Sequence, residues 1–207
     1  MTERTVTVIG TGRAAVTPDV VRLDLRIGHD AQDVAAALTG ASKGIAAVGR
    51  VVRDQGVPDQ DIRTLDANVS QRYDNTGTPV GFTAQQRLGV VVRRLDQVGE
   101  ILEATASEVG NALLVDQVRL DVDDRSEGLS RAREAAFAEA RAKAEQYAAL
   151  SGSEVGAVLA VAEAGVAPIQ PIRRMMAMAA MESSAGMPVE GGDLELTASV
   201  TVTWELR

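Results

Sequence analysis

A glycine-rich turn near the N-terminus is the first pattern that could do chemistry. Gly10, Gly12 and Ala15 have the spacing of the GxGxxA dinucleotide-binding turn. That turn needs a helix starting at the second glycine, because the helix N-terminus holds the pyrophosphate. Pro18 and the apolar alternation from Val20 to Ile27 predict a strand there instead. The sequence therefore favours a bulge or a tight strand connection, and no cofactor is predicted.

The titratable residues do not suggest a catalytic or metal-binding group. His29 is the only histidine, and the absence of cysteine excludes thiolate catalysis, disulfides, zinc fingers and iron–sulfur ligation. Asp121, Asp123 and Asp124 look like cation ligands, but Arg125 stands where a calcium loop needs another ligand. We expect a solvated histidine, and acids that end a strand and cap a helix. Since GxSxG, P-loop and HExxH patterns are also missing, the sequence predicts a protein that is not an enzyme.

A Met/Pro-rich segment from about residue 165 to 192 has the most unusual composition in the chain. It contains five of the six methionines and an arginine pair, and these are the candidate oligomer-interface residues: Met175, Met176, Met178, Met181, Met187, Arg173 and Arg174. Methionine adapts to irregular apolar surfaces, which favours an interface or a cavity lining. Thioethers also bind Cu(I), although this segment lacks a supporting cysteine or histidine. A disordered tether is the third interpretation, since so long a loop is uncommon inside a compact domain.

Composition limits the partners and the location. Lys+Arg 21 against Asp+Glu 29 give a formal charge of −8, which repels nucleic-acid phosphates and anionic membranes. Aromatic residues make up 2% of the chain, too few for base-stacking platforms. The N-terminus runs directly into an alternating strand pattern without the features of a signal peptide. We therefore expect a cytoplasmic protein with no nucleic-acid partner and no transmembrane segment.

The elements that would position these residues occur twice in the same order. The residues Val-Arg-Leu-Asp at 21–24 open a pattern of strand, long helix, strand and strand, and the same four residue types recur at 118–121. We assign half-repeats to about residues 17–93 and 113–206, within a single domain spanning 1–207. A shorter helix from Leu95 to Val109 connects them.

Apolar periodicity gives the fold class. The first long helix carries one apolar stripe, formed by Val34, Leu38, Ala41, Ile45, Val48 and Val52. The last strand alternates from Leu194 to Leu206, which predicts a buried Trp204. A doubly wound sheet needs strands that are apolar on both faces, and these are not. The sequence therefore predicts a two-layer α+β fold of duplicated βαββ units, with a largely antiparallel sheet and long helices on one face. The other face would meet water or another subunit.

The order and spacing of several segments resemble the SIMPL domain family over essentially the whole chain. The segments are Val6–Gly12 with Pro18–Asp19, Gly56–Thr64, Gly81–Gln85, Ala132–Ala148 and Gly192–Trp204. The family includes a kinase-associated signalling adaptor, periplasmic immunogenic proteins and proteins linked to oxidative stress. The resemblance implies an α+β fold, no established catalytic site, and ring-like or channel-like oligomers.

We therefore predict a non-enzymatic, self-assembling SIMPL-domain protein that forms a ring-like or channel-like homo-oligomer. The alternative is a monomeric or small-oligomer adaptor, stress-related or handling Cu(I) through its Met-rich segment. The two differ in oligomeric state, which makes size in solution the discriminating measurement.

Overall fold

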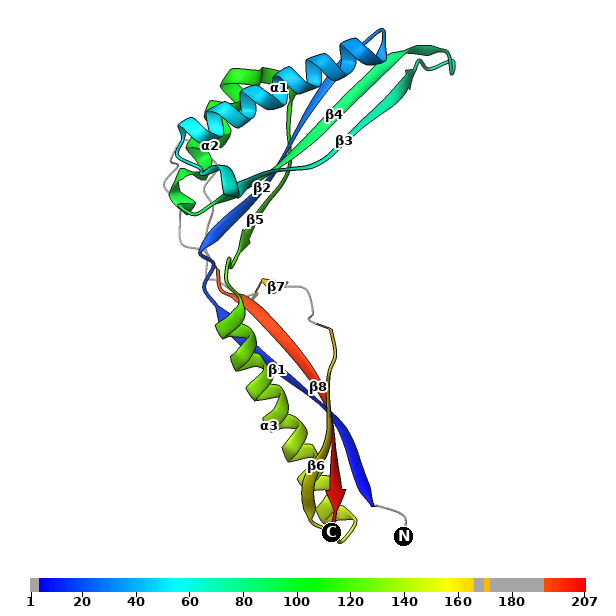
Figure 1. Ribbon diagram of the computed structural model, residues 1–207, viewed down its shortest axis with the longest axis vertical. Helices are drawn as coiled ribbons and strands as arrows, with labels where there is room; N and C mark the ends of the chain where they lie inside the picture. Colours follow the sequence, from blue (N-terminus) through cyan, green and yellow to red (C-terminus); the bar gives the residue numbers. More distant parts are fainter. Residues whose placement is uncertain (1–3, 166–169, 172–191) are drawn as a thin grey trace, which may run out of the picture. The chain divides into compact units, whose positions relative to one another are not determined.

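The protein divides into two compact units, each with its own sheet and its own apolar core (Figure 1). The computed structural model describes residues 4–165, 170–171 and 192–207 of the chain. Unit 2 comprises residues 19–121, and unit 1 comprises the other described residues. Both sheets are antiparallel and both carry helices, so the α+β class predicted from the sequence is confirmed.

Unit 2 is a four-stranded sheet with strand order β3-β4-β2-β5. Its elements are β2 (Val20–Ala31), α1 (Val34–Asp54), the 3-10 turn η1 (Asp59–Asp61), β3 (Ile62–Tyr73), β4 (Pro79–Val92), η2 (Leu95–Gln97), α2 (Val98–Val109), η3 (Gly110–Ala112) and β5 (Leu113–Asp121). Helix α1 packs on β2 and β4, and α2 packs beside α1. The core between them is built from large aliphatic side chains, among them Leu23, Leu25, Ile27 and Ile101.

Local sequence signals set the ends of these elements. The Asp33 carboxylate accepts a hydrogen bond from the Ala36 amide at 2.8 Å and caps α1. Gly56 has φ +86° and follows the helix as a left-handed cap. In the β3–β4 hairpin the Asp74 carboxylate accepts backbone amides of the turn, and Gly77 has φ +82°.

The apolar stripe of α1 is buried only in part. Ala41, Ile45, Val48 and Val52 face the sheet, as predicted. Val34 and Leu38 are exposed instead, because Ala37 takes the buried position in the first turns. The predicted apolar stripe therefore faces the sheet only from Ala41 onward.

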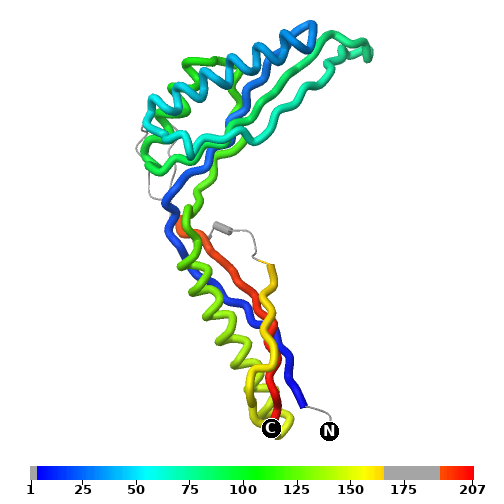
Figure 2. The backbone as a smooth tube through the Cα atoms, in the orientation of Figure 1, coloured from blue at the N-terminus to red at the C-terminus, as the bar shows by residue number. Residues whose placement is uncertain are grey.

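Unit 1 has one long helix over a sheet with strand order β1-β8-β6, to which β7 adds by pairing with β8. Its elements are β1 (Thr5–Val16), α3 (Ser126–Leu150), β6 (Val155–Glu163), β7 (Gln170–Pro171) and β8 (Leu194–Leu206). Strands β1 and β8 come from opposite ends of the chain and run side by side in continuous register (Figure 2). Helix α3 lies along these two strands.

The two units share one topology, but the first strand of unit 1 is not the one that the sequence repeat suggests. In unit 2 the chain runs through β2, α1, β3 and β4, and β4 lies between β2 and β3 in the sheet. In unit 1 the chain runs through β1, α3, β6 and β8, and β8 lies between β1 and β6 in the same way. Strand β5, which opens the second half-repeat in the sequence, pairs with β2, and its Val118 and Leu120 pack against the unit 2 core. The N-terminal strand β1 takes its place beneath α3.

Small residues explain why β1 fits beneath α3. Every fourth residue along this helix is a buried alanine: Ala132, Ala136, Ala140, Ala144 and Ala148. Gly10 and Gly12 of β1 face them, and a Cβ on either glycine would overlap the α3 backbone. Strand β1 pairs with β8 without a register shift. The predicted bulge or tight connection is therefore wrong, and the glycine pair serves close helix–strand packing.

Candidate functional site

A groove in unit 1 lies between α3 and β6. Helix α3 packs on β1 and β8 and leaves β6 largely uncovered. Two hollows result, of about 610 and 280 Å³, and they share Phe137 and Arg141 as lining residues. We call them together the α3–β6 groove, which is lined by Phe137, Arg141, Val158, Val161, Val200 and Trp204.

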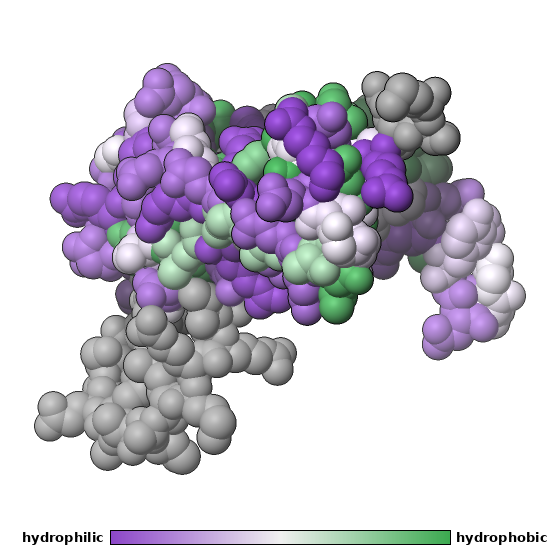
Figure 3. Space-filling view, turned by 90° about the horizontal axis from the view of Figure 1, so that it is seen from below, coloured by the Kyte–Doolittle hydropathy of each residue, from purple (hydrophilic) through white to green (hydrophobic). Residues whose placement is uncertain are grey.

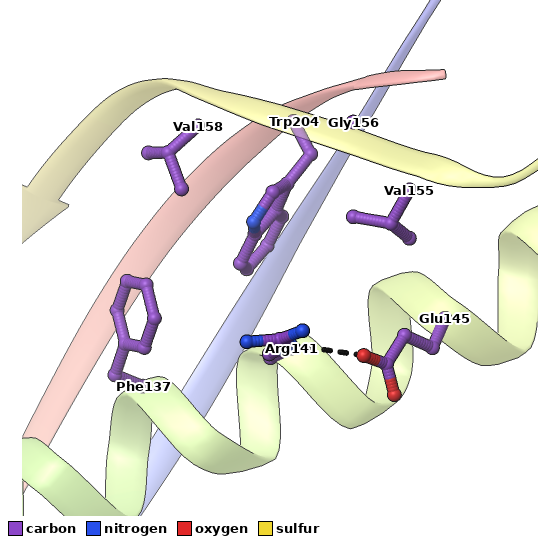
Figure 4. A pocket seen from close by; sticks show the side chains of 7 residues that line it. All are labelled: Phe137, Arg141, Glu145, Val155, Gly156, Val158 and Trp204. Carbon is purple, nitrogen blue, oxygen red and sulfur yellow. Dashed lines mark hydrogen bonds and ion pairs between the residues drawn. The ribbon is translucent and has the colours of Figure 1, made fainter. Parts of the chain in front are cut away.

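The floor of the α3–β6 groove is aromatic and aliphatic (Figure 4). Trp204 on β8 is 3% exposed, which confirms its predicted burial. Its indole points toward α3, where the Phe137 ring lies 5.9 Å away at an interplanar angle of 56°. Val158 and Val161 on β6 are 44% and 56% exposed. An apolar floor with this much exposed aliphatic surface is suited to binding another apolar surface.

The helix side of the groove is a single row of side chains on α3, which we call the α3 ridge. Along it basic, aromatic, basic and acidic residues follow one another. Arg133, Phe137, Arg141 and Glu145 are spaced four residues apart, so they form one row along α3. The Arg141 guanidinium donates to Glu145 at 2.9 Å (Figure 4). Arg133 donates to Glu163 on β6 at 2.8 Å. All four charged side chains are more than a third exposed, so neither ion pair contributes much to stability.

Side chains of α3 cover the opposite edge of the unit 1 sheet, which is formed by β1. The Lys143 ammonium donates to the Ile9 carbonyl at 2.9 Å, and Glu139 accepts a hydrogen bond from the Thr11 amide. The Thr11 amide and then Lys143 lower the pKa of Glu139. These contacts satisfy backbone groups of β1 that point away from β8, which blocks the pairing of another strand at that edge.

The face of the unit 1 sheet that points away from α3 is uncharged at its centre. We call it the open sheet face, and its centre is formed by Thr7, Ile9, Thr11, Ala160, Ala162, Ser199, Thr201 and Thr203. Ile9 is 58% exposed there. Ion pairs flank the centre at its two ends, Arg13–Glu195 at 3.3 Å and Arg207–Glu205 at 2.9 Å. On the face shown in Figure 3, apolar residues reach the surface in areas broken up by hydrophilic side chains.

Charged residues on the outer face of the unit 2 sheet pair across strands. Arg22 donates to Asp121 at 2.5 Å, and Arg26 donates to Asp116 at 2.8 Å. Asp121 is buried at the end of β5, as the strand-end interpretation predicts. Asp124 accepts a hydrogen bond from the Ser126 amide in the first turn of α3, and its contacts with Ser126 lower its pKa. These acids therefore organise strand and helix ends.

Among the described residues, no group of three or more His, Asp or Glu side chains could hold a metal ion. His29 is exposed near the end of β2, in agreement with the prediction, and its ring lies against Gly40 of α1. The candidate interface residues Met175, Met176, Met178, Met181, Met187, Arg173 and Arg174 lie outside the described residues.

The sequence interpretation missed the α3–β6 groove and the centre of the open sheet face. Two signals were present: the four-residue spacing of Arg133, Phe137, Arg141 and Glu145, and the absence of charge from Val155 to Ala162. Neither shows which strands the helix covers, since that depends on contacts between distant parts of the chain.

Comparison with known proteins gives the family. Residues 6–204 match the family described as SIMPL, a protein of unknown function (DUF541). The chain belongs to the SIMPL family. It is similar to the 26 kDa periplasmic immunogenic proteins of Brucella melitensis and Brucella abortus. Each is 27% identical over 217 residues, covering 98% of this chain and 84% of the relative.

The relatives correct the predicted location. Both are named periplasmic proteins, so the expectation of a cytoplasmic protein is wrong. That expectation depended only on the residue pattern at the N-terminus. None of the helices in the described part of the chain is both long enough and apolar enough to cross a membrane.

Proposed function

We propose that this protein is a non-enzymatic, self-assembling member of the SIMPL family that forms a ring-like or channel-like homo-oligomer. Its compartment is the periplasm, as the names of its relatives suggest. The observation that carries the proposal is the open sheet face, where seven other uncharged residues surround an exposed Ile9 between two ion pairs.

This surface has the chemistry of an interface between subunits. Sheets pack face to face through small and aliphatic side chains, with charges kept to the rim. Full burial of a side chain such as Ile9 stabilises an assembly by about 1.5–3 kcal/mol relative to exposure. The hydroxyls of Thr7 and Thr203 already bond to each other at 2.9 Å, which lowers the cost of burying them.

The Met-rich segment belongs to the same proposal. Met175, Met176, Met178 and Met181, with Met187 and the Arg173–Arg174 pair, are proposed to contact another subunit or line a shared cavity. Support comes from composition alone, because thioether side chains gain by burial against an adaptable apolar surface.

Light scattering coupled to size exclusion tests self-assembly. We expect a particle larger than a dimer at micromolar concentration, and a smaller one for Ile9→Asp, which places a charge at the centre of the open sheet face. Leu38→Asp is the matched control, because Leu38 is an exposed aliphatic residue of unit 2. A monomeric wild type would overturn the proposal and favour the adaptor or Cu(I)-handling alternative.

A further inference from the structure

We propose that the α3–β6 groove is a second interface, in which two copies of this chain pack their α3 ridges antiparallel across a two-fold axis. This inference rests on the proposed function, because it supplies one of the contacts of the self-assembly. The ridge consists of Arg133, Phe137, Arg141 and Glu145.

The order of charges along the ridge makes it complementary to itself. An axis midway between Phe137 and Arg141 sets Arg133 of one copy opposite Glu145 of the other, at both ends of the contact. It also sets each Phe137 ring opposite the Arg141 guanidinium of the other copy. Opposite charges meet at the rim, and a guanidinium meets an aromatic ring at the centre, which is a favourable contact. Residue i meets residue j and j meets i, as a two-fold interface requires.

The spacing of the ridge also fits helix packing. Rows of residues four apart interdigitate when two helices cross at roughly −50°, the most frequent packing class. Ala138 lies next to the proposed axis and lines the groove, so its small side chain leaves room there for Phe137 and Arg141 of the other copy. The second copy would cover Val158 and Val161, which are otherwise exposed in the described structure.

The ion pairs within each chain do not oppose this contact. Arg141–Glu145 and Arg133–Glu163 are exposed pairs, and such pairs are worth about 0–1 kcal/mol. Exchanging or sharing their partners with a second copy therefore costs little. Burial of Phe137 and the exposed valines supplies the driving force.

Charge reversal tests the pairing between copies directly. Arg133→Glu sets like charges at both ends of the interface, so we expect its dissociation constant to rise at least tenfold. The double variant R133E/E145R restores opposite charges between copies and should recover most of the affinity. The double variant R133E/E163R restores only the pair within the chain and should not recover it. Sedimentation velocity over a concentration series measures all four proteins.

A cysteine near the axis gives an independent test. The natural chain has no cysteine, so Ala138→Cys introduces a single thiol. Two such thiols across the axis should form a disulfide under mild oxidation, giving a covalent dimer on a denaturing gel. Ala149→Cys, exposed at the far end of the same helix, is the control and should react much less.

The outcomes separate this inference from the proposed function. If the wild type assembles but R133E assembles like it, or if R133E/E163R rescues as well as R133E/E145R, the ridge interface is wrong and self-assembly stands. Equal cross-linking of the two cysteine variants would also overturn it. A monomeric wild type removes both proposals.

Discussion

Both units pack a helix on an antiparallel sheet, but they make room for this contact differently. In unit 2, Gly40 and Gly44 of α1 make room for His29 and Ile27 of β2. In unit 1 small residues lie on both partners, since Gly10 and Gly12 of β1 face the alanine row of α3, and Gly128 of α3 lies against Leu196. The same topology is thus packed through side chains in one unit and nearly backbone to backbone in the other.

This difference in packing determines how much of each sheet is covered. Large aliphatic residues fill the unit 2 core, and α2 adds Val98 and Ile101 to it. The unit 1 core has alanines, a few valines and Trp204. A row of alanines brings α3 close to β1 and β8 but does not reach β6, which leaves the α3–β6 groove. Unit 2 is therefore the better-filled unit, and unit 1 carries the surfaces proposed for assembly.

The largest effect is expected from Trp204→Ala, because unit 1 has few other large buried side chains. We expect a loss of roughly 3–5 kcal/mol in the free energy of unfolding, as for other core aromatics. Urea unfolding followed by far-UV circular dichroism measures it. Tyr73→Ala is the matched control, since Tyr73 is 58% exposed and should change stability by no more than about 0.5 kcal/mol. Similar costs for the two variants would contradict the assignment of Trp204 to a core.

Glycine-to-alanine substitutions test this comparison, because the change in the free energy of unfolding should have opposite signs in the two units. Gly12→Ala forces a methyl group against the α3 backbone, which cannot move aside, and should cost about 3 kcal/mol. Gly40→Ala meets the exposed His29 ring, which can rotate away, and gains about 0.5–1 kcal/mol of helix propensity. Thermal unfolding of both variants gives the answer. If Gly12→Ala is the better tolerated of the two, the close packing inferred for unit 1 is wrong.

Much of the local structure was predictable, because its causes lie within a few residues. The left-handed Gly56 after α1 and the Asp74 turn between β3 and β4 are residue types that end a helix and form a hairpin, and the carboxylate of Asp33 is of a type that caps a helix. Alternation likewise located β8 and the burial of Trp204. Single-residue preferences and short-range periodicity suffice for such features.

Pairing of distant segments was not predictable in the same way. Strands β1 and β5 both alternate, and only their fit to a helix or a neighbouring core decides which sheet each joins. The exposure of Val34 and Leu38 depends on where α1 crosses the sheet, which helical periodicity does not report. The α3–β6 groove is likewise a consequence of which strands α3 covers, so its residues had no local signal of their own.

A smaller effect is expected at the N-termini of the long helices, which are capped differently. Asp33 caps α1 with its own carboxylate, so Asp33→Ala should cost about 1 kcal/mol. Arg125 at the equivalent position of α3 makes no side-chain cap bond, so Arg125→Ala should cost less than Asp33→Ala. Chemical denaturation resolves a difference of this size. Equal losses would mean that α1 does not depend on its cap.

The smallest expected effect is a pH dependence of the stability that Glu139 contributes at the edge of β1. The Thr11 amide and Lys143 lower the pKa of Glu139 in the folded state below its ordinary value of 4.5. A lowered folded pKa stabilises the protein above the unfolded value, and this stabilisation is lost as the pH falls through the folded pKa. Glu139→Gln should therefore lower the Tm slightly at pH 7, and the gap between variant and wild type should shrink as the pH falls below the ordinary Glu value of 4.5. Tm measured across pH for both proteins, with the exposed Glu134→Gln as control, tests this. A gap that stays constant down to pH 3 would show that the Glu139 charge does not stabilise the β1 edge.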